Sequence, residues 1–240
     1  QSRRMAEYSQ SSHPHVLYTN EFVEAMPWLP AKIGQATAAN LASYHHRPST
    51  PEQELITEAD RLSSSMDREE EDADTGDVRT PFRKVRLVSI AAVAGRPEAD
   101  PSKAPAFGLA PLTPEDSYPT RFSEESNLTD DYAALWRSFV ADWRQNRCPE
   151  AFGFLARALS ILERHTWCIP SATNALPDIS LYDHLKTTAA IAVCLAAPGK
   201  DPQNPFLLVA GDLTGIQNYL FDLRGRSEEH TSELQSHLNL

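Results

Sequence analysis

The sequence predicts a mixed fold, with helices over most of its length and then one strand that leads into a further helix. Apolar side chains recur at helical spacing in several segments, and a helix-capping signature precedes one of them. Near the C-terminal end, the apolar run 205–212, "PFLLVAGD", is followed by the helix-like segment "TGIQNYLFDL". We therefore expect an all-α region followed by the start of an α+β region.

Residues 1–66 are expected to be helical, and a second helix is expected over 33–44. Thr50 can cap the next helix, Pro51 suits its first position, and Gln53 completes a capping box. The predicted apolar residues are spaced for helices: Leu17, Tyr18, Phe22 and Val23 in the first, and Leu55, Ile56, Ala59 and Leu62 in the helix after Thr50.

The middle of the chain offers fewer signals. Residues 67–80 are acidic and nearly free of apolar side chains, so they are predicted to be a mobile surface loop. The segment "KVRLVSI", 84–90, predicts a strand or a short extended segment. Residues 95–128 are rich in proline and polar residues, which indicates a linker with at most short extended pieces.

Two helices and a capped third are predicted next. The helix over 129–145 has one apolar stripe, and the following helix repeats the pattern. Asp183 is expected to cap a helix that runs through Leu195. The predicted stripes are Tyr132, Leu135, Trp136, Phe139, Val140 and Trp143 in the first helix, and Phe152, Leu155, Leu159 and Leu162 in the second.

Composition excludes several classes of protein. The 240 residues carry a formal charge of -11, so there is no global basic field for nucleic acid, and any such site must be a local patch or come from a partner. The three cysteines form no C-x-x-C pair, which argues against a disulfide framework or a zinc ribbon and predicts a cytoplasmic protein. No apolar run reaches transmembrane length, so no membrane partner is expected.

The C-terminal tail differs from the rest of the chain. Residues 226–237, "RSEEHTSELQSH", match the in-frame translation of a common short-read sequencing adapter, whereas a natural polar tail is the alternative. We expect 226–240 to be a non-native tail. The chain also begins with Gln, so we expect a fragment truncated at both ends.

Four side chains are candidate metal ligands: His15, His45, His46 and Asp60. Imidazole and carboxylate groups that converge from several helices can hold a divalent ion, which lowers the pKa of a bound water. The spacing alone also allows a surface His-His pair at a helix end and a solvated Asp60.

These residues lie in segments that resemble a known family. "HPHVLYTNEFVEAM" and "ASYHHRPSTPEQELITEADRLSSSMDRE" are similar to the HD domain of the large signature subunit of type III CRISPR effector complexes. The resemblance implies a nuclease that acts on single-stranded DNA with a divalent metal (Mn, Ni or Mg). It places His15, His45, His46, Asp60, Ser63, Ser64 and Arg68 at matched positions, with His13 as a weaker candidate than His15. The family's His-Asp dyad has no match here, so no catalytic set is complete.

A second segment, "IPSATNALPDISLYDHLKTTAAIAVCL", 169–195, resembles the same family. Its polar residues can simply hold a turn and cap a helix, because Asp and Ser side chains bond to nearby backbone groups. Small residues such as Ala192 allow a close helix contact. The alternative is that His184 and Lys186 face a neighbouring nucleotide cleft.

A third motif follows at "GDLTGIQNYLF", which resembles the first strand and helix of the family's palm domain, a ferredoxin-like fold. Thr214 and Gln217 form a capping box, and free amides at a helix start favour phosphate. The resemblance implies that Thr214, Gly215 and Gln217 contact ATP with Mg, whereas Asp212 is a weaker candidate for a metal ligand. A capped strand-to-helix turn with no ligand is the alternative.

The three motifs occur in the family's order. We expect a partial HD domain at 1–95, a linker at 96–128, and a helical segment with the start of the first palm domain at 129–225. The resemblance implies subtype A of this family, and it implies single-stranded DNA cleavage and synthesis of cyclic oligoadenylates by the intact protein. We expect neither activity in this chain alone. It implies partners as well: the other effector subunits, guide CRISPR RNA and target RNA. A free-standing HD phosphohydrolase and a catalytically dead scaffold subunit are the alternatives.

Overall fold

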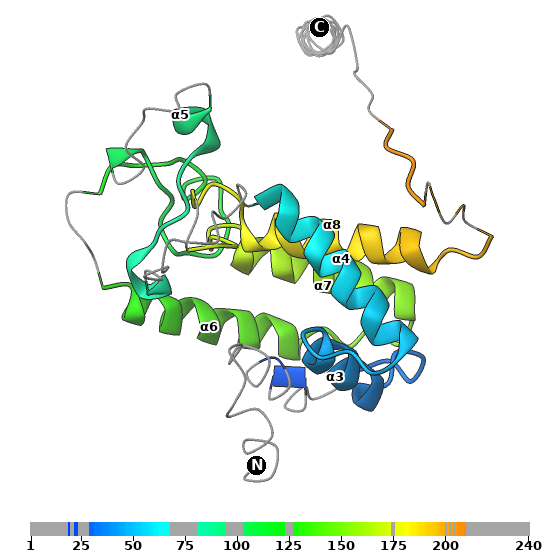
Figure 1. Ribbon diagram of the computed structural model, residues 1–240. Helices are drawn as coiled ribbons and strands as arrows, with labels where there is room; N and C mark the ends of the chain where they lie inside the picture. The colour runs from blue at the N-terminus through cyan, green and yellow to red at the C-terminus, as the bar shows by residue number, and fades with distance from the viewer. Residues whose placement is uncertain are drawn as a thin grey trace, which may run out of the picture. The chain divides into compact units, whose positions relative to one another are not determined.

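Figure 1 shows the computed structural model of the chain. The structure describes residues 19, 22–23, 29–67, 81–94, 103–122, 127–173, 176–199, 201, 203 and 205–209. They fall in two units, Gln1–Pro205 and Phe206–Leu240. Almost all of the described residues belong to the first unit, and they are mostly helical, as the sequence predicts for an all-α region.

Helices α3, Gln35–Tyr44, and α4, Pro51–Asp67, pack on each other. Both match the predicted segments. Gly34 precedes α3 with a φ of 71°, a left-handed conformation that glycine adopts without strain. The buried positions of α4 include Gln53, Ala59 and Ser63, so this helix turns a partly polar face inward.

The aromatic core lies between α6, Thr129–Arg144, and α7, Ala151–Thr166. Phe139 and Trp143 of α6 pack against Phe154 and Ala158 of α7, and the rings of Trp143 and Phe154 meet edge to face at 6.0 Å. The predicted helix over 129–145 and its buried stripe are confirmed at Leu135, Phe139 and Trp143, but Trp136 of the same stripe is exposed.

The face predicted for α7 is wrong. Phe152, Leu155 and Leu159 were expected to be buried, yet all three are exposed, and Phe152 is 86% exposed. Instead, α7 turns Phe154, Ala158 and His165 toward α6. Both sets have helical spacing because α7 is apolar on more than one side, so the position of α6 decides which face is buried.

The middle segment consists mostly of extended backbone, and isolated bridges rather than a regular sheet join its parts. After the 3₁₀ turn Phe82–Lys84, the backbone is extended to Ser89, and the short helix α5, Ile90–Val93, follows. The prediction of an extended segment over 84–90 therefore holds only for its central residues. Isolated antiparallel bridges join Val88 to Ala106 and Ala106 to Thr120.

The described part of 96–128 contacts other elements of the same unit. The amide of Leu112 donates to the carbonyl of Arg164 at 2.7 Å, and the indole of Trp167 donates to the carbonyl of Ala110 at 2.9 Å. The ring of Phe107 meets that of Trp167 at 5.2 Å. These residues thus cover the C-terminal end of α7. The predicted domain boundaries, including the linker at 96–128, stay predictions.

The last helix of the first unit is α8, Leu181–Ala196, which packs along α4 and more lightly on α7. Ser180 caps it, since its hydroxyl accepts from the amide of Asp183 at 3.0 Å. The predicted helix is therefore confirmed, but the capping residue is Ser180 rather than Asp183, whose carboxylate accepts from the Ser180 hydroxyl at 2.7 Å. In Figure 1, α4 crosses α8 although more than a hundred residues separate them.

The predicted start of a palm domain lies largely outside the described residues. Of the expected strand at 205–212, residues 205–209 are described, and they pair with no other described strand. The ferredoxin-like fold therefore stays a prediction. Within the described ranges, no helix is both long enough and apolar enough to cross a membrane.

Candidate functional site

The start of α4 holds α3 in place through one buried side chain. The Thr50 hydroxyl accepts from the amide of Gln53 at 3.3 Å, as the capping box predicts. The reciprocal bond differs, because the side-chain oxygen Oε1 of Gln53 accepts from the backbone amide of Ser49, at 2.7 Å, rather than from that of Thr50. The Gln53 amide nitrogen then donates to Asn40 of α3 at 2.8 Å, which fixes the angle between the two helices.

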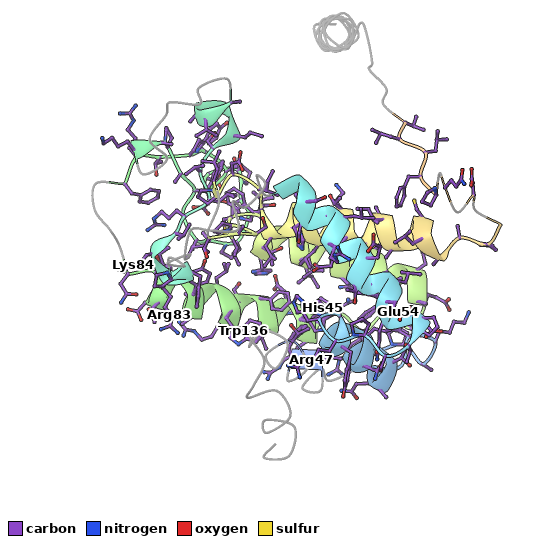
Figure 2. The ribbon with its side chains drawn as sticks, in the orientation of Figure 1. His45, Arg47, Glu54, Arg83, Lys84 and Trp136 are labelled. Carbon is purple, nitrogen blue, oxygen red and sulfur yellow. The ribbon has the colours of Figure 1, made fainter. Side chains whose placement is uncertain are left out.

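His45 and His46 follow directly on α3, and Figure 2 labels His45 near α4. Their rings lie 4.1 Å apart, centroid to centroid, and both side chains are half-buried. The Nδ1 atom of His45 is 2.8 Å from the carbonyl of Ala42, and the Thr57 hydroxyl of α4 donates to the carbonyl of His45. The histidine pair is therefore anchored to α4 through its backbone.

Asp60 of α4 faces His184 of α8. The carboxylate oxygen Oδ1 of Asp60 lies 3.2 Å from Nε2 of His184, and the two side chains are 26% and 14% exposed. The packing of α4 on α8 is what brings them together. An imidazole nitrogen and a carboxylate oxygen at this distance can share a proton, or both can bind one cation.

Ser63, one turn after Asp60, holds the other side of the same imidazole. Its hydroxyl oxygen is 3.2 Å from Nδ1 of His184 and 3.1 Å from the carbonyl oxygen of His184. If Nδ1 carries a proton, it donates to Ser63, and the Ser63 hydroxyl donates to the carbonyl; Nε2 then donates its own proton to Asp60 or, when a cation displaces that proton, presents a lone pair to the cation. This is the tautomer that a metal-binding histidine needs.

The order Ser63, His184, Asp60 has the composition of a nucleophilic triad, but its geometry does not support that chemistry. Ser63 is only 1% exposed, so a substrate carbonyl cannot reach its hydroxyl. Its hydroxyl also has the backbone carbonyl of His184 as an acceptor. Ser63 is therefore a positioning residue for His184 rather than a nucleophile.

The charges around Asp60 favour its ionised form. Burial raises the pKa of the Asp60 carboxyl, but the hydrogen bond and charge of His184, with the charges of His45 and His46, outweigh burial and lower it below its usual value. The two predicted histidines therefore act on the same carboxylate as His184 does. Three of the four predicted metal ligands, His45, His46 and Asp60, thus share one region of the first unit.

The chemistry of this donor set suits a divalent first-row ion, which imidazole and carboxylate groups bind well. However, no three His, Cys, Asp or Glu side chains within the described ranges converge closely enough to hold an ion by themselves. Asp60 and His184 are the pair in direct contact. A complete site would need ligands from the rest of the protein.

Several predicted site residues lie outside the described residues: His15, Thr214, Gly215, Gln217 and Asp212. The alternative in which His184 faces a nucleotide cleft stays a prediction, and in the structure its imidazole lies beside Asp60 of α4. Lys186 is exposed, with its ammonium 5.6 Å from the ring centre of Tyr182. The only sequence signal for the role of His184 was that its segment and that of Asp60 resemble the same family, since no local pattern predicts a contact across more than a hundred residues.

Comparison with known proteins gives one consistent answer. No family model matches the chain. Curated relatives do match, and those described here share the description "CRISPR system single-strand-specific deoxyribonuclease Cas10/Csm1 (subtype III-A)". The protein of Enterococcus italicus is 28% identical over 222 residues, which is 76% of this chain and 28% of the relative's length.

Two other relatives carry the same description. The protein of Methanocaldococcus jannaschii is 28% identical over 154 residues, covering 49% of this chain and 18% of the relative. The protein of Mycobacterium tuberculosis is 32% identical over 90 residues, covering 29% of this chain and 11% of the relative. This chain therefore spans less than a third of the length of the relatives that it matches.

Proposed function

Because the chain is Cas10-like, we propose that it forms part of the large subunit of a type III CRISPR effector complex, and that Asp60 and His184 belong to its metal-dependent nuclease site. The observation that carries the proposal is the 3.2 Å contact between these two side chains. That contact brings together the two family-like segments, 42–69 and 169–195.

The proposed substrate is single-stranded DNA, which the names of the relatives specify for those proteins. A bound divalent ion (Mn, Ni or Mg) would supply a water of lowered pKa and would stabilise charge on the phosphate. In this chain, Asp60 and His184 would bind the ion, Ser63 would fix the tautomer of His184, and His45 and His46 would favour the ionised carboxylate. His15 is a proposed further ligand.

The Asp60–His184 pair is tested by metal binding, measured separately from catalysis. Titration of Mn²⁺ into the full-length subunit, followed by electron paramagnetic resonance, should show weaker binding for Asp60→Asn and for His184→Ala. Each substitution removes a side chain that is proposed to bind the ion directly, so the dissociation constant for Mn²⁺ should rise by at least about tenfold. The matched control is Glu58→Gln, which removes an exposed carboxylate of the same helix.

Cleavage is tested in the full-length subunit with a single-stranded DNA substrate. The same two substitutions should abolish Mn²⁺-dependent cleavage, while Glu58→Gln should not change it. Cleavage at the wild-type rate by His184→Ala would remove that residue from the site. A full-length protein that assembles with its partners but cuts no DNA with Mn²⁺ would favour the catalytically dead scaffold.

We also propose that the region around Thr214 contacts ATP in a palm domain that makes cyclic oligoadenylates when target RNA is bound. The support is the resemblance of "GDLTGIQNYLF" to the family's motif. Thr214→Arg in the full-length subunit should reduce messenger synthesis at least about tenfold, because a long cation would occupy the space of the nucleotide, and should leave DNA cleavage unchanged. Equal synthesis by the variant would exclude the nucleotide role. The proposed partners are the other effector subunits, guide RNA and target RNA.

A further inference from the structure

A local basic and aromatic surface stands apart from the Asp60–His184 pair. We call it the basic–aromatic patch, and its members are Phe82, Arg83, Lys84, Arg86, Arg121 and Phe122. Phe82, Arg83, Lys84, Arg121 and Phe122 are all exposed. Figure 2 shows Arg83 and Lys84 beside the N-terminal end of α6, away from His45.

Backbone pairing brings the two halves of the patch together. Ala106 and Thr120 exchange hydrogen bonds of 2.9 and 2.8 Å, and the amide of Phe107 donates to the carbonyl of Leu87 at 2.8 Å. The segments that carry Arg86 and Phe122 are thus neighbours of one shared segment. The guanidinium of Arg86 lies directly over the ring of Phe122, 3.8 Å from its centre.

Aromatic rings alternate with the cations on this surface. Phe82 is 50% exposed, although the edge of its ring contacts Tyr132 of α6 at 5.1 Å. The guanidinium of Arg83 lies 5.3 Å from the centre of the Phe82 ring. Exposed phenylalanines are costly to hydrate, so rings held in place at the surface beside cations indicate a surface that receives a ligand.

The charge of the patch is opposite to that of the chain as a whole. Three exposed cations, Arg83, Lys84 and Arg121, and the mostly buried Arg86 lie on these neighbouring segments, in a protein of formal charge -11. A carboxylate oxygen of Asp131 lies 4.0 Å from Arg86, and Asp131 is itself half-exposed. Such a contact is weak in water, and a multiply charged anion can compete with it.

A ligand that suits this surface carries both closely spaced negative charges and flat rings. Single-stranded nucleic acid has both, because its phosphates pair with arginine and lysine and its unpaired bases stack on aromatic side chains. A duplex offers phosphates but keeps its bases stacked inside. An acidic peptide would meet the cations but would leave the rings without a partner.

We propose that the basic–aromatic patch binds single-stranded nucleic acid, with phosphates on Arg83, Lys84 and Arg121 and a base on Phe82. The proposal goes beyond the nuclease site, and it does not require the metal. It also explains how a chain with a net negative charge can hold a polyanion, since binding is confined to one local surface.

The test is fluorescence anisotropy of the chain with labelled 20-mers of deoxythymidine and of uridine, in EDTA so that metal has no part. The double variant Arg83→Gln/Lys84→Gln should bind about tenfold more weakly at low salt, and the slope of log K against log salt should fall by roughly 1.4, the loss of two phosphate contacts. The matched control, Arg144→Gln/Arg157→Gln, removes two exposed cations elsewhere and should match the wild type.

A second variant tests the contribution of the Phe82 ring to binding. Phe82→Leu keeps an apolar contact for Tyr132 but removes the flat face, so binding should weaken at least about fivefold with an unchanged salt slope. The tighter of the two probes identifies the strand as DNA or RNA. Three results would overturn the proposal: no binding by the wild type, equal losses in the control double variant, or displacement of the probes by poly-glutamate as effectively as by unlabelled strand.

Discussion

At the scale of single residues, the site depends on how one imidazole is held. Ser63 contacts Nδ1 of His184 and Asp60 lies beside Nε2, so the two neighbours decide which nitrogen carries the proton. Ser63 is buried although serine is a polar residue, which would cost stability unless its hydroxyl were satisfied. The contact with His184 therefore explains the burial of Ser63.

Replacement of Ser63 tests this positioning role. Ser63→Ala removes the acceptor for Nδ1, so His184 should lose its preferred tautomer and Mn²⁺ should bind roughly tenfold more weakly. Mn²⁺ titration by electron paramagnetic resonance would measure the change. The matched control is Ser65→Ala, because Ser65 is exposed and bonds only locally, to the carbonyl of Leu62. Equal affinities for the two variants would contradict the role of Ser63.

Tyr132 gives a prediction about alkaline pH. Burial, and then the charge of Cys168, raise the pKa of Tyr132 to about 12, and its hydroxyl has no hydrogen-bond partner among the described residues. The folded state therefore keeps the Tyr132 proton between pH 10 and 12 while the unfolded state loses it, so stability falls as the pH rises through this range.

Tyr132→Phe should remove the loss of folding stability that the titration of Tyr132 causes at alkaline pH. At pH 7 the variant should be as stable as the wild type or up to about 1 kcal/mol more stable, because a buried hydroxyl without a partner is removed. At pH 10.5 its advantage should be larger. Urea unfolding at both pH values measures the difference, and an advantage that shrinks at high pH would refute the assignment. Cys168, whose pKa burial raises to about 11, titrates in both proteins and cancels.

At the scale of helices, the sequence predicts which segments are helical better than it predicts which face of each helix is buried. The helical segments were predictable because capping residues and apolar spacing are local signals, as at Thr50 and in the Phe139–Trp143 stripe. The buried face of α7 was not predictable, because apolar residues lie on two of its sides. The contact of His184 with Asp60 was equally inaccessible, since it depends on the packing of α8 on α4.

The two faces of α7 should respond differently to truncation. Phe154→Ala should lower the free energy of unfolding by about 3–5 kcal/mol, because Phe154 is 3% exposed and fills the core beside Trp143. Phe152→Ala, two residues earlier in the same helix, should change it by less than about 0.5 kcal/mol. Chemical denaturation of both variants measures the contrast, and similar losses would show that the Phe152 side is buried as well.

At the scale of the whole molecule, the first unit is closed by contacts between distant parts of the sequence. The most extensive helix contact joins α4 to α8, with α6 and α7 between them in the chain. The N-terminal helices are therefore held by the C-terminal part of the unit as well as by their own neighbours. The covalent connection between α4 and Pro81 should be dispensable for this association.

A split chain tests that expectation. Co-expressed pieces 1–70 and 81–240 should copurify, because the interface between α4 and α8 is complete once both pieces are present. Affinity purification through a tag on one piece, followed by gel electrophoresis, detects the other. Ala59→Arg should abolish copurification, since Ala59 is fully buried on α4, whereas Glu58→Arg at an exposed position should not. Separate elution of the unsubstituted pieces would contradict the expectation.

The contact between Asp60 and His184 has a consequence for the time at which the site forms. During synthesis, Asp60 leaves the ribosome long before His184, and a loop of more than a hundred residues must close before the two can meet. Such long-range contacts form late in folding. A nascent chain that has exposed only α3 and α4 carries no assembled pair, so the emergence of α8 sets the earliest moment at which Asp60 and His184 can meet.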